Sequence, residues 1–423
     1  MPGAVYVLAG LILGIVGLVL WQQHDRAHNL VTAYGGEHRR FRTLGSKLGF
    51  VTGVLILLSA PVGFSWIGFR GVHLPTQFIP GLPLNEKWLL VGLTAAIYAI
   101  GAIGMNLLIG NTGQVSLGHS GFILVGAYST GYFGQDLLVG GKHLPGIVWI
   151  LLAAVMGALV SAVIGPFALR LRGNYLAMVS IFIVLGAGHV AKNWISFTGG
   201  DVNPRNDLPG VVFTVWPGKS IRFNDGGSSN FFDTWFLTKS QGYFWLCWAF
   251  AILAIIVGRN LMRSRQGRAM MAVRDRDLSA EVIGVRQMYT KTWAFAVSGA
   301  FAALAGALYA SYYATVQPGS FALPFSIQFI AMIVIGGVGT VYGSVLGAIV
   351  IAALFSLFQE GQGLLKGLPL IELDPSKPTG LTLDLLSVLV YGLALIFFLM
   401  FFPTGLAGLW AKVRRYFATW PFS

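Results

Sequence analysis

The sequence predicts an all-α integral membrane protein with about eleven transmembrane helices, and three observations support this fold class. Hydrophobic residues make up 55% of the 423 residues, and the mean hydropathy is +0.72. Only 10% of the residues are charged, against about 25% in a soluble domain. The third observation is the distribution of Lys and Arg, which gather in short segments between apolar runs, as cytoplasmic loops do.

The chain begins with an apolar run at 3–21, which is about long enough to cross a bilayer. A basic segment at 24–47 follows and carries Arg39, Arg40 and Arg42. We therefore expect residues 1–47 to form an extra N-terminal transmembrane helix and a basic cytoplasmic linker.

The remaining spans follow from apolar runs bounded by polar, Gly or Pro residues. They are predicted at 48–66, 88–109, 122–133, 147–169, 175–192, 243–257, 292–314, 326–335, 344–358 and 385–402. When these spans are threaded alternately, the inner segments hold eighteen of the 28 Lys and Arg, although they are shorter than the outer ones. The segments 197–241 and 359–382 are then outer loops, residues 48–410 form the transmembrane domain, and 411–423 is a basic cytoplasmic tail.

Two glycine-rich breaks interrupt this pattern, at 110–121 (GNTGQVSLGHSG) and 336–343 (GGVGTVYG). Each lies where a span arriving from outside gives way to one that returns. Irregular backbone at membrane depth survives only inside the protein or beside a watery cavity, and paired breaks indicate a transport site. The predicted substrate path comprises Asn111, Thr112, Gln114, Ser116, His119, Ser120, Gly336, Gly337, Gly339 and Thr340. The alternative is that these glycines only allow close packing of helices.

The basic segment 258–291 lies between two apolar runs on the predicted inner side. Within it, Asp275 to Ile283 reads as a short helix, with Gly284 placed to end it. A helix held outside the bilayer is suited to docking a soluble partner, although an ordinary solvated loop would show similar charge.

Several kinds of chemistry lack support in the sequence. A single cysteine, Cys247, excludes a disulfide framework and a cysteine metal cluster, and no catalytic cluster or complete nucleotide-binding motif is present. The net charge of +13 is explained by the inner loops, so nucleic acid is not an expected partner. No Asp or Glu lies in the middle of a span, which disfavours coupling to protons or sodium.

Six stretches resemble the permease subunits of high-affinity branched-chain amino-acid ABC importers. They are GNTGQVSLGHSGFILVGAYS (110–129), RLRGNYLAMVSI (170–181), SRQGRAMMAVRDRDLSAEVIGV (264–285), KTWAFAVSGAFAALAGALYA (291–310), IQFIAMIVIGGVGTVYGSVLGA (327–348) and FFPTGLAGL (401–409). The N-terminal region to Lys47 and the outer segments 201–241 and 359–382 depart from the family pattern. These departures leave the substrate and the docking of a binding protein open.

The resemblance implies an ABC importer permease fold that performs no chemistry itself. It implies three kinds of partner besides membrane lipids: a second permease subunit, two cytoplasmic ATPase subunits that bind ATP and Mg, and a periplasmic or lipid-anchored binding protein. By analogy, residues 272–284 are the coupling helix that enters an ATPase. The coupling residues would be Arg274, Asp275, Asp277, Leu278, Ala280, Glu281 and Gly284.

We therefore expect a multi-pass protein of the bacterial cytoplasmic (inner) membrane that imports branched-chain or similar small neutral amino acids. Related permeases handle urea and short amides, so these cargoes remain an alternative. A second alternative, from a different class, is an ATP-independent channel or facilitator in which 258–291 is a simple tether.

Overall fold

The computed structural model describes most of the chain between residues 86 and 365. The described residues are 86–136, 138–139, 142–168, 174–200, 212–216, 219–222, 229–230, 236–237, 239–365, 389, 392–393, 396–398, 400–401 and 404–410. The predicted segments 3–21, 24–47, 48–66 and 411–423, and most of 385–402, lie outside them. The chain divides into two compact units, Met1–Leu89 with Leu409–Ser423, and Leu90–Gly408, and the second contains nearly all of the described residues.

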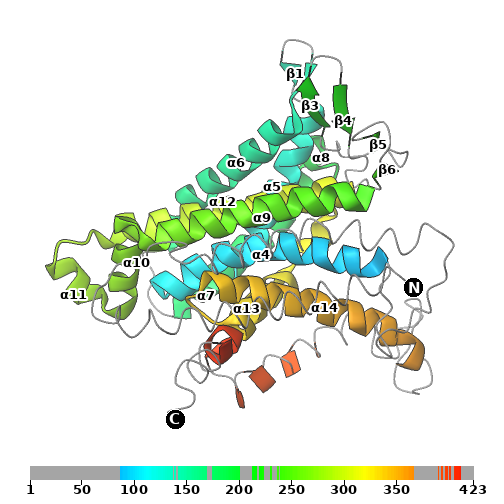
Figure 1. Ribbon diagram of the computed structural model, residues 1–423. Coiled ribbons are helices and arrows are strands. Elements are labelled where there is room, and N and C mark those ends of the chain that lie inside the picture. Colours follow the sequence, from blue (N-terminus) through cyan, green and yellow to red (C-terminus); the bar gives the residue numbers. More distant parts are fainter. Residues whose placement is uncertain are drawn as a thin grey trace, which may run out of the picture. The chain divides into compact units, whose positions relative to one another are not determined.

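Four helices of the described part are long and apolar enough to cross a membrane. They are α4 (Glu86–Thr112), α6 (Gly146–Ala168), α9 (Lys239–Arg263) and α12 (Gln287–Tyr313) (Figure 1). A fifth apolar helix, α7 (Asn174–Asn193), is somewhat shorter in its apolar part. These five cover predicted spans, so the chain is a helical multi-pass membrane protein.

Two predicted spans are half-length helices. The helices α5 (His119–Gly131) and α13 (Leu323–Gly336) have 13 and 14 residues. A helix of that length is about 20 Å long, against about 30 Å of hydrocarbon in a bilayer. At the second glycine break α13 bends by 119° into α14 (Val341–Leu365), so the two together make one further candidate crossing. The described residues thus contain four or five crossings of the predicted eleven.

The predicted outer loops contain short antiparallel hairpins that the sequence pattern did not indicate. They pair β1 (Leu138–Val139) with β2 (Lys142–His143), β3 (Val212–Trp216) with β4 (Lys219–Arg222), and β5 (Ser229–Asn230) with β6 (Phe236–Leu237). Short turns of helix complete these regions, namely η1 (Tyr132–Asp136), α8 (Ile195–Thr198) and η2 (Pro318–Phe321).

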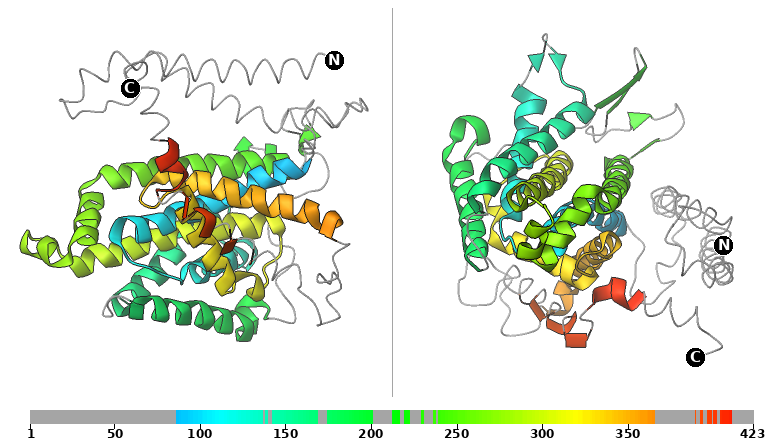
Figure 2. Two further views of the ribbon diagram at one scale, coloured as in Figure 1. Left: turned by 90° about the horizontal axis from the view of Figure 1, so that it is seen from below. Right: turned by 90° about the vertical axis from the view of Figure 1, so that its left-hand side faces the viewer.

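The polar segment between α9 and α12 forms two helices, α10 (Arg265–Asp275) and α11 (Asp277–Val282). This α10–α11 pair lies at one end of the long helices, and the β3–β4 hairpin lies at the other (Figures 1 and 2). The two ends match the predicted inner and outer sides, because α10 and α11 carry the basic segment.

The core of the unit is organised around α12, which packs against α5 and α6, and these two helices also contact each other. Close approach depends on glycine. A Cβ at Gly306 of α12 would clash with the Ile123 carbonyl of α5, and a Cβ at Gly157 of α6 would clash with Ala303 of α12. Small residues at such contacts allow helix backbones in membranes to approach closely.

The outer face of α6 is apolar and exposed. Its exposed side chains recur every fourth residue, at Leu151, Val155, Leu159 and Val163. This spacing places them in one stripe along the helix, as expected for a surface that faces lipid or another membrane subunit.

Candidate functional site

The first glycine break lies between α4 and α5. Gly113 has a positive φ of +69°, which a side chain would oppose, and its backbone N–H donates to the Ile109 carbonyl at 3.1 Å. An irregular segment from Gln114 to Gly118 follows before α5 begins. The six polar residues that were predicted here are all buried, namely Asn111, Thr112, Gln114, Ser116, His119 and Ser120.

Four of these residues have hydrogen-bond partners within the protein. The Thr112 hydroxyl donates to the Leu108 carbonyl at 2.5 Å, and Ser116 Oγ accepts the Gly118 N–H at 3.2 Å. His119 Nε2 lies 2.9 Å from the Gly101 carbonyl oxygen. The Ser120 N–H donates to Ser326 Oγ at 3.0 Å, which joins α5 to α13. His119 and Ser120 therefore help to hold α5 against α4 and α13.

Gln114 differs from these residues. Its side chain is 6% exposed, and within the described part of the chain neither its Nε2 nor its Oε1 has a hydrogen-bond partner. Burying an amide without a partner costs about 1–3 kcal/mol on the protein mutational scale. Gln114 is therefore a buried polar group of the break that is available to another molecule.

The second glycine break lies between α13 and α14. Gly337 and Gly339 have φ values of +122° and +83°, and Thr340 Oγ1 donates to the Gly337 carbonyl at 2.9 Å. Gly336 lies so close to Gly343 that a Cβ on Gly336 would clash with the Gly343 carbonyl. The bend of 119° therefore requires glycine for both backbone conformation and space.

The structure brings the two breaks together at Gly110 and Gly339, where no Cβ fits on Gly110, and Asn106 of α4 binds the second break. Asn106 Oδ1 accepts the Gly339 N–H at 2.7 Å. Its Nδ2 donates to the Thr340 carbonyl at 2.8 Å and to Ser344 Oγ at 2.7 Å. Sequence reasoning missed Asn106, although an amide in an apolar span is a recognisable signal of an inter-helix hydrogen bond.

The α10–α11 pair begins with a Ser264 N-cap, whose Oγ accepts the Gly267 N–H at 3.2 Å. The helix predicted over 275–283 begins two residues later than expected, at Asp277. Arg276 is extended, with φ −156° and ψ 109°, and separates α10 from α11. Gly284, with φ +88°, follows the end of α11 as predicted, and its N–H bonds to the Glu281 carbonyl at 2.9 Å.

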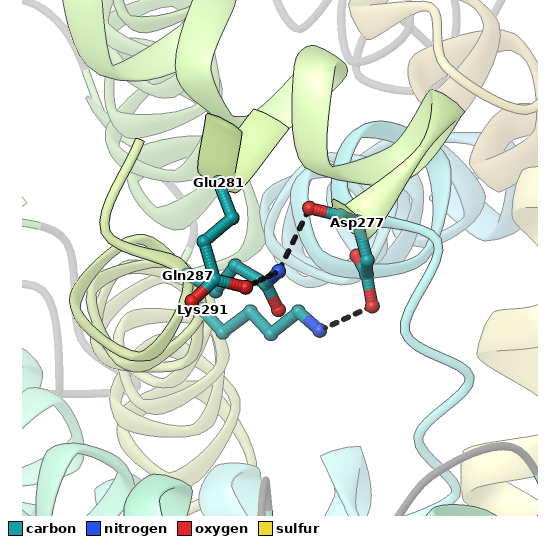
Figure 3. Close-up of polar contacts among 4 residues, drawn as sticks. All are labelled: Asp277, Glu281, Gln287 and Lys291. Atoms are coloured by element: carbon teal, nitrogen blue, oxygen red, sulfur yellow. Dashed lines mark hydrogen bonds and ion pairs between the residues drawn. The ribbon is translucent and has the colours of Figure 1, made fainter. Parts of the chain in front are cut away.

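The two acids of α11 bind the first turns of α12 (Figure 3). Lys291 Nζ lies 2.9 Å from Asp277 Oδ2. Gln287 Nε2 donates to the Asp277 carbonyl at 2.7 Å and to Glu281 Oε2 at 3.0 Å. Exposed ion pairs contribute about 0–1 kcal/mol each, so these contacts fix the orientation of α11 more than they stabilise the fold.

Part of the exposed surface of α11 and its C-cap is apolar. Leu278, Val282 and Ile283 are 74%, 87% and 74% exposed, whereas Ala280 is buried against the rest of the chain. We call these three exposed side chains the apolar tip. Asp275 is also exposed, next to this tip. Clustered apolar side chains on an otherwise charged protrusion mark an interaction surface.

Arg274 does not point toward the apolar tip. Its Nη1 donates to the Gly110 carbonyl at 2.5 Å, so the predicted coupling residue contacts the first glycine break. No group of three or more His, Cys, Asp or Glu residues suited to a metal ion occurs within the described ranges.

The region that contains both breaks and the α10–α11 pair is similar to known proteins. Residues 89–402 match the family described as branched-chain amino acid transport system / permease component, which is most of the chain. The chain belongs to this permease family. The match includes both breaks, Asn106 and the α10–α11 pair.

Three relatives illustrate the range of the family. The high-affinity branched-chain amino acid transport system permease protein LivM of Escherichia coli is 30% identical over 279 residues, which is 62% of each chain. The corresponding LivH protein of Salmonella typhimurium is 24% identical over 266 residues, covering 62% of this chain and 81% of LivH. The autoinducer 2 import system permease protein LsrC of Salmonella paratyphi B is 33% identical over 107 residues, covering 24% and 31%.

This permease therefore spans less than two thirds of the length of the LivM protein that it matches. No solved structure matches the chain.

Proposed function

We propose that this permease is the transmembrane subunit of an ATP-driven ABC importer in the bacterial inner membrane. Its cargo would be branched-chain or similar small neutral amino acids, the class that the LivM and LivH names give. The chain itself performs no chemistry, and ATP and Mg bind partner subunits. The partners would be a second permease subunit, two ATPase subunits and an external binding protein.

The observation that carries this proposal is the α10–α11 pair. Its apolar tip is exposed at the predicted inner end of the helices, while its other contacts reach α12 and the glycine breaks. A protrusion with this arrangement can receive motion from a soluble subunit and pass it to the region where polar groups lie buried among the spans. A simple tether between two spans requires no such contacts, which favours the importer over an ATP-independent facilitator.

Replacing Val282 by Asp tests the docking surface. Val282 is 87% exposed, so the change should leave folding and membrane insertion unaffected. A charge placed in a desolvated apolar contact costs several kcal/mol, so we expect the ATPase subunits to be lost from the purified complex. Val282→Leu keeps the apolar surface and should retain them. Retention of the ATPase subunits by Val282→Asp would contradict the proposed docking.

The cargo is tested by uptake into vesicles that hold the complete complex and its binding protein. We expect ATP-dependent uptake of leucine, isoleucine or valine. Uptake of urea or a short amide instead would assign the alternative cargo. Uphill uptake by the permease alone would contradict the importer function altogether.

A further inference from the structure

Arg274 lies in the last turn of α10, but its side chain leaves the α10–α11 pair and crosses to both glycine breaks. The guanidinium donates to the Gly110 carbonyl in the first break. The aliphatic part lies over Gly113, where an added Cβ would be 3.4 Å from Arg274 Cγ. At Gly339 of the second break, an added Cβ would be 3.3 Å from Arg274 Nη1. One side chain thus touches both breaks.

The Gly110 carbonyl is a suitable acceptor because of its place in α4. The helix ends at Thr112, so this carbonyl is among the last four, which have no partner within a helix. The partial negative charge at a helix C-terminus also favours a cation. Arg274 therefore caps α4 from a different element, and the cap exists only while the α10–α11 pair stays in place.

We propose that Arg274 is a latch that ties the position of the α10–α11 pair to the backbone of both breaks. The latch rests on the proposed function, and it gives Arg274 a positioning role instead of a docking contact. A displacement of the pair larger than the Arg274 side chain can follow takes the donor beyond hydrogen-bonding distance of Gly110. Movement of the pair by the ATPase subunits would then release Gly110, Gly113 and Gly339 together.

Hydrogen exchange on the purified full-length chain, without ATPase subunits, tests the latch directly. We expect Arg274→Ala to raise exchange in peptides covering residues 106–121 and 334–345 by about ten- to a hundredfold, because a hydrogen bond from a charged donor stabilises by that factor. Arg274→Lys should give a smaller increase, since the ammonium keeps the charge but loses the planar fork.

Arg268→Ala is the matched control. Arg268 lies on the same helix as Arg274. Its Nη1 also donates to a backbone carbonyl, but to the nearby Arg263 carbonyl at 2.8 Å and not to either break. Its removal should leave exchange in both breaks unchanged. Unchanged exchange in Arg274→Ala would overturn the latch. An equal rise in all helices, α6 and α12 included, would also overturn it, because that pattern reports general destabilisation.

The assembled complex gives an independent readout. We expect Arg274→Ala to retain the ATPase subunits and to hydrolyse ATP while uptake falls about tenfold or more, since the lost bond is the one that transmits the movement. Loss of the ATPase subunits in this variant would show that Arg274 acts in docking and would overturn the latch. If the unmodified chain binds no ATPase subunits, the proposed function fails, and the exchange experiment still decides whether the latch exists.

Discussion

At the scale of single residues, the polar groups of the breaks separate into two kinds. Asn106 and Ser120 are committed to hydrogen bonds that join one helix to another. Gln114 is as deeply buried but has no partner for either atom of its amide among the described residues. Folded proteins keep unpaired buried polar groups mainly where function requires them. Among the residues of the predicted path, we therefore expect Gln114 to contact the cargo.

Gln114→Met tests this role, because methionine has a similar shape and no amide. We expect the stability of the purified permease to be unchanged or higher, since an unpaired buried amide is removed. Uptake should fall by about tenfold. A polar group of the cargo that loses the Gln114 amide as its hydrogen-bond partner weakens binding by about 1–3 kcal/mol. Thermal unfolding and vesicle uptake are the two measurements.

Thr130→Val is the control for Gln114→Met. It removes a buried hydroxyl that donates to the Gly126 carbonyl of its own helix at 2.9 Å, and it should leave uptake unchanged. Equal uptake by Gln114→Met and the unmodified chain would remove Gln114 from the cargo path.

At the scale of helices, glycine decides which elements can meet. The contact of α12 with α5 depends on Gly306, where no side chain fits, whereas Gly186 of α7 has open space around it. The same residue type therefore has different consequences on a central helix and on an outer one.

Gly306→Val should separate α5 from α12 and displace the N-terminal end of α5 at the first break. Overpacking of this kind costs typically about 1–3 kcal/mol, and backbone contact makes relaxation difficult. We expect loss of the monodisperse purified permease in size-exclusion chromatography. Gly186→Val should purify normally, because nothing lies within 4 Å of a Cβ there. Normal purification of both variants would show that the α5–α12 contact can relax.

At the scale of the whole molecule, the structure has two chemically different ends. The α10–α11 pair and its basic residues lie at one end of the long helices, and the β3–β4 hairpin lies at the other (Figure 1). Basic segments tend to remain on the cytoplasmic side during insertion, so we expect the α10–α11 end to face the cytoplasm.

Labelling with a membrane-impermeant thiol reagent tests this orientation. Cys247 is buried, so the unmodified chain should not react. Leu278→Cys, in the apolar tip, should react only when the cytoplasmic face is accessible. Ser320→Cys, at an exposed position of η2 on the predicted outer side, should react in intact spheroplasts. The reverse pattern would overturn the orientation.

The sequence alone determined the membrane class, the permease family, the long helices and the positions of both breaks. The family was indicated by the six stretches that resemble its members, whereas the other properties depend on local composition: apolar length, glycine runs and the placement of Lys and Arg. Local pattern was less informative at 264–285, where a single helix was expected over 275–283 and two helices meet at Arg276.

Only the tertiary structure decided how these parts meet. Asn106 joins α4 to a break 233 residues away, and Arg274 reaches a carbonyl 164 positions earlier in the chain. The acids of α11 bind α12, and Gln114 is buried with both of its amide atoms unpaired among the described residues. Such contacts depend on the packing of helices distant in sequence, and hydrogen-bond partners across that distance leave no local pattern to read.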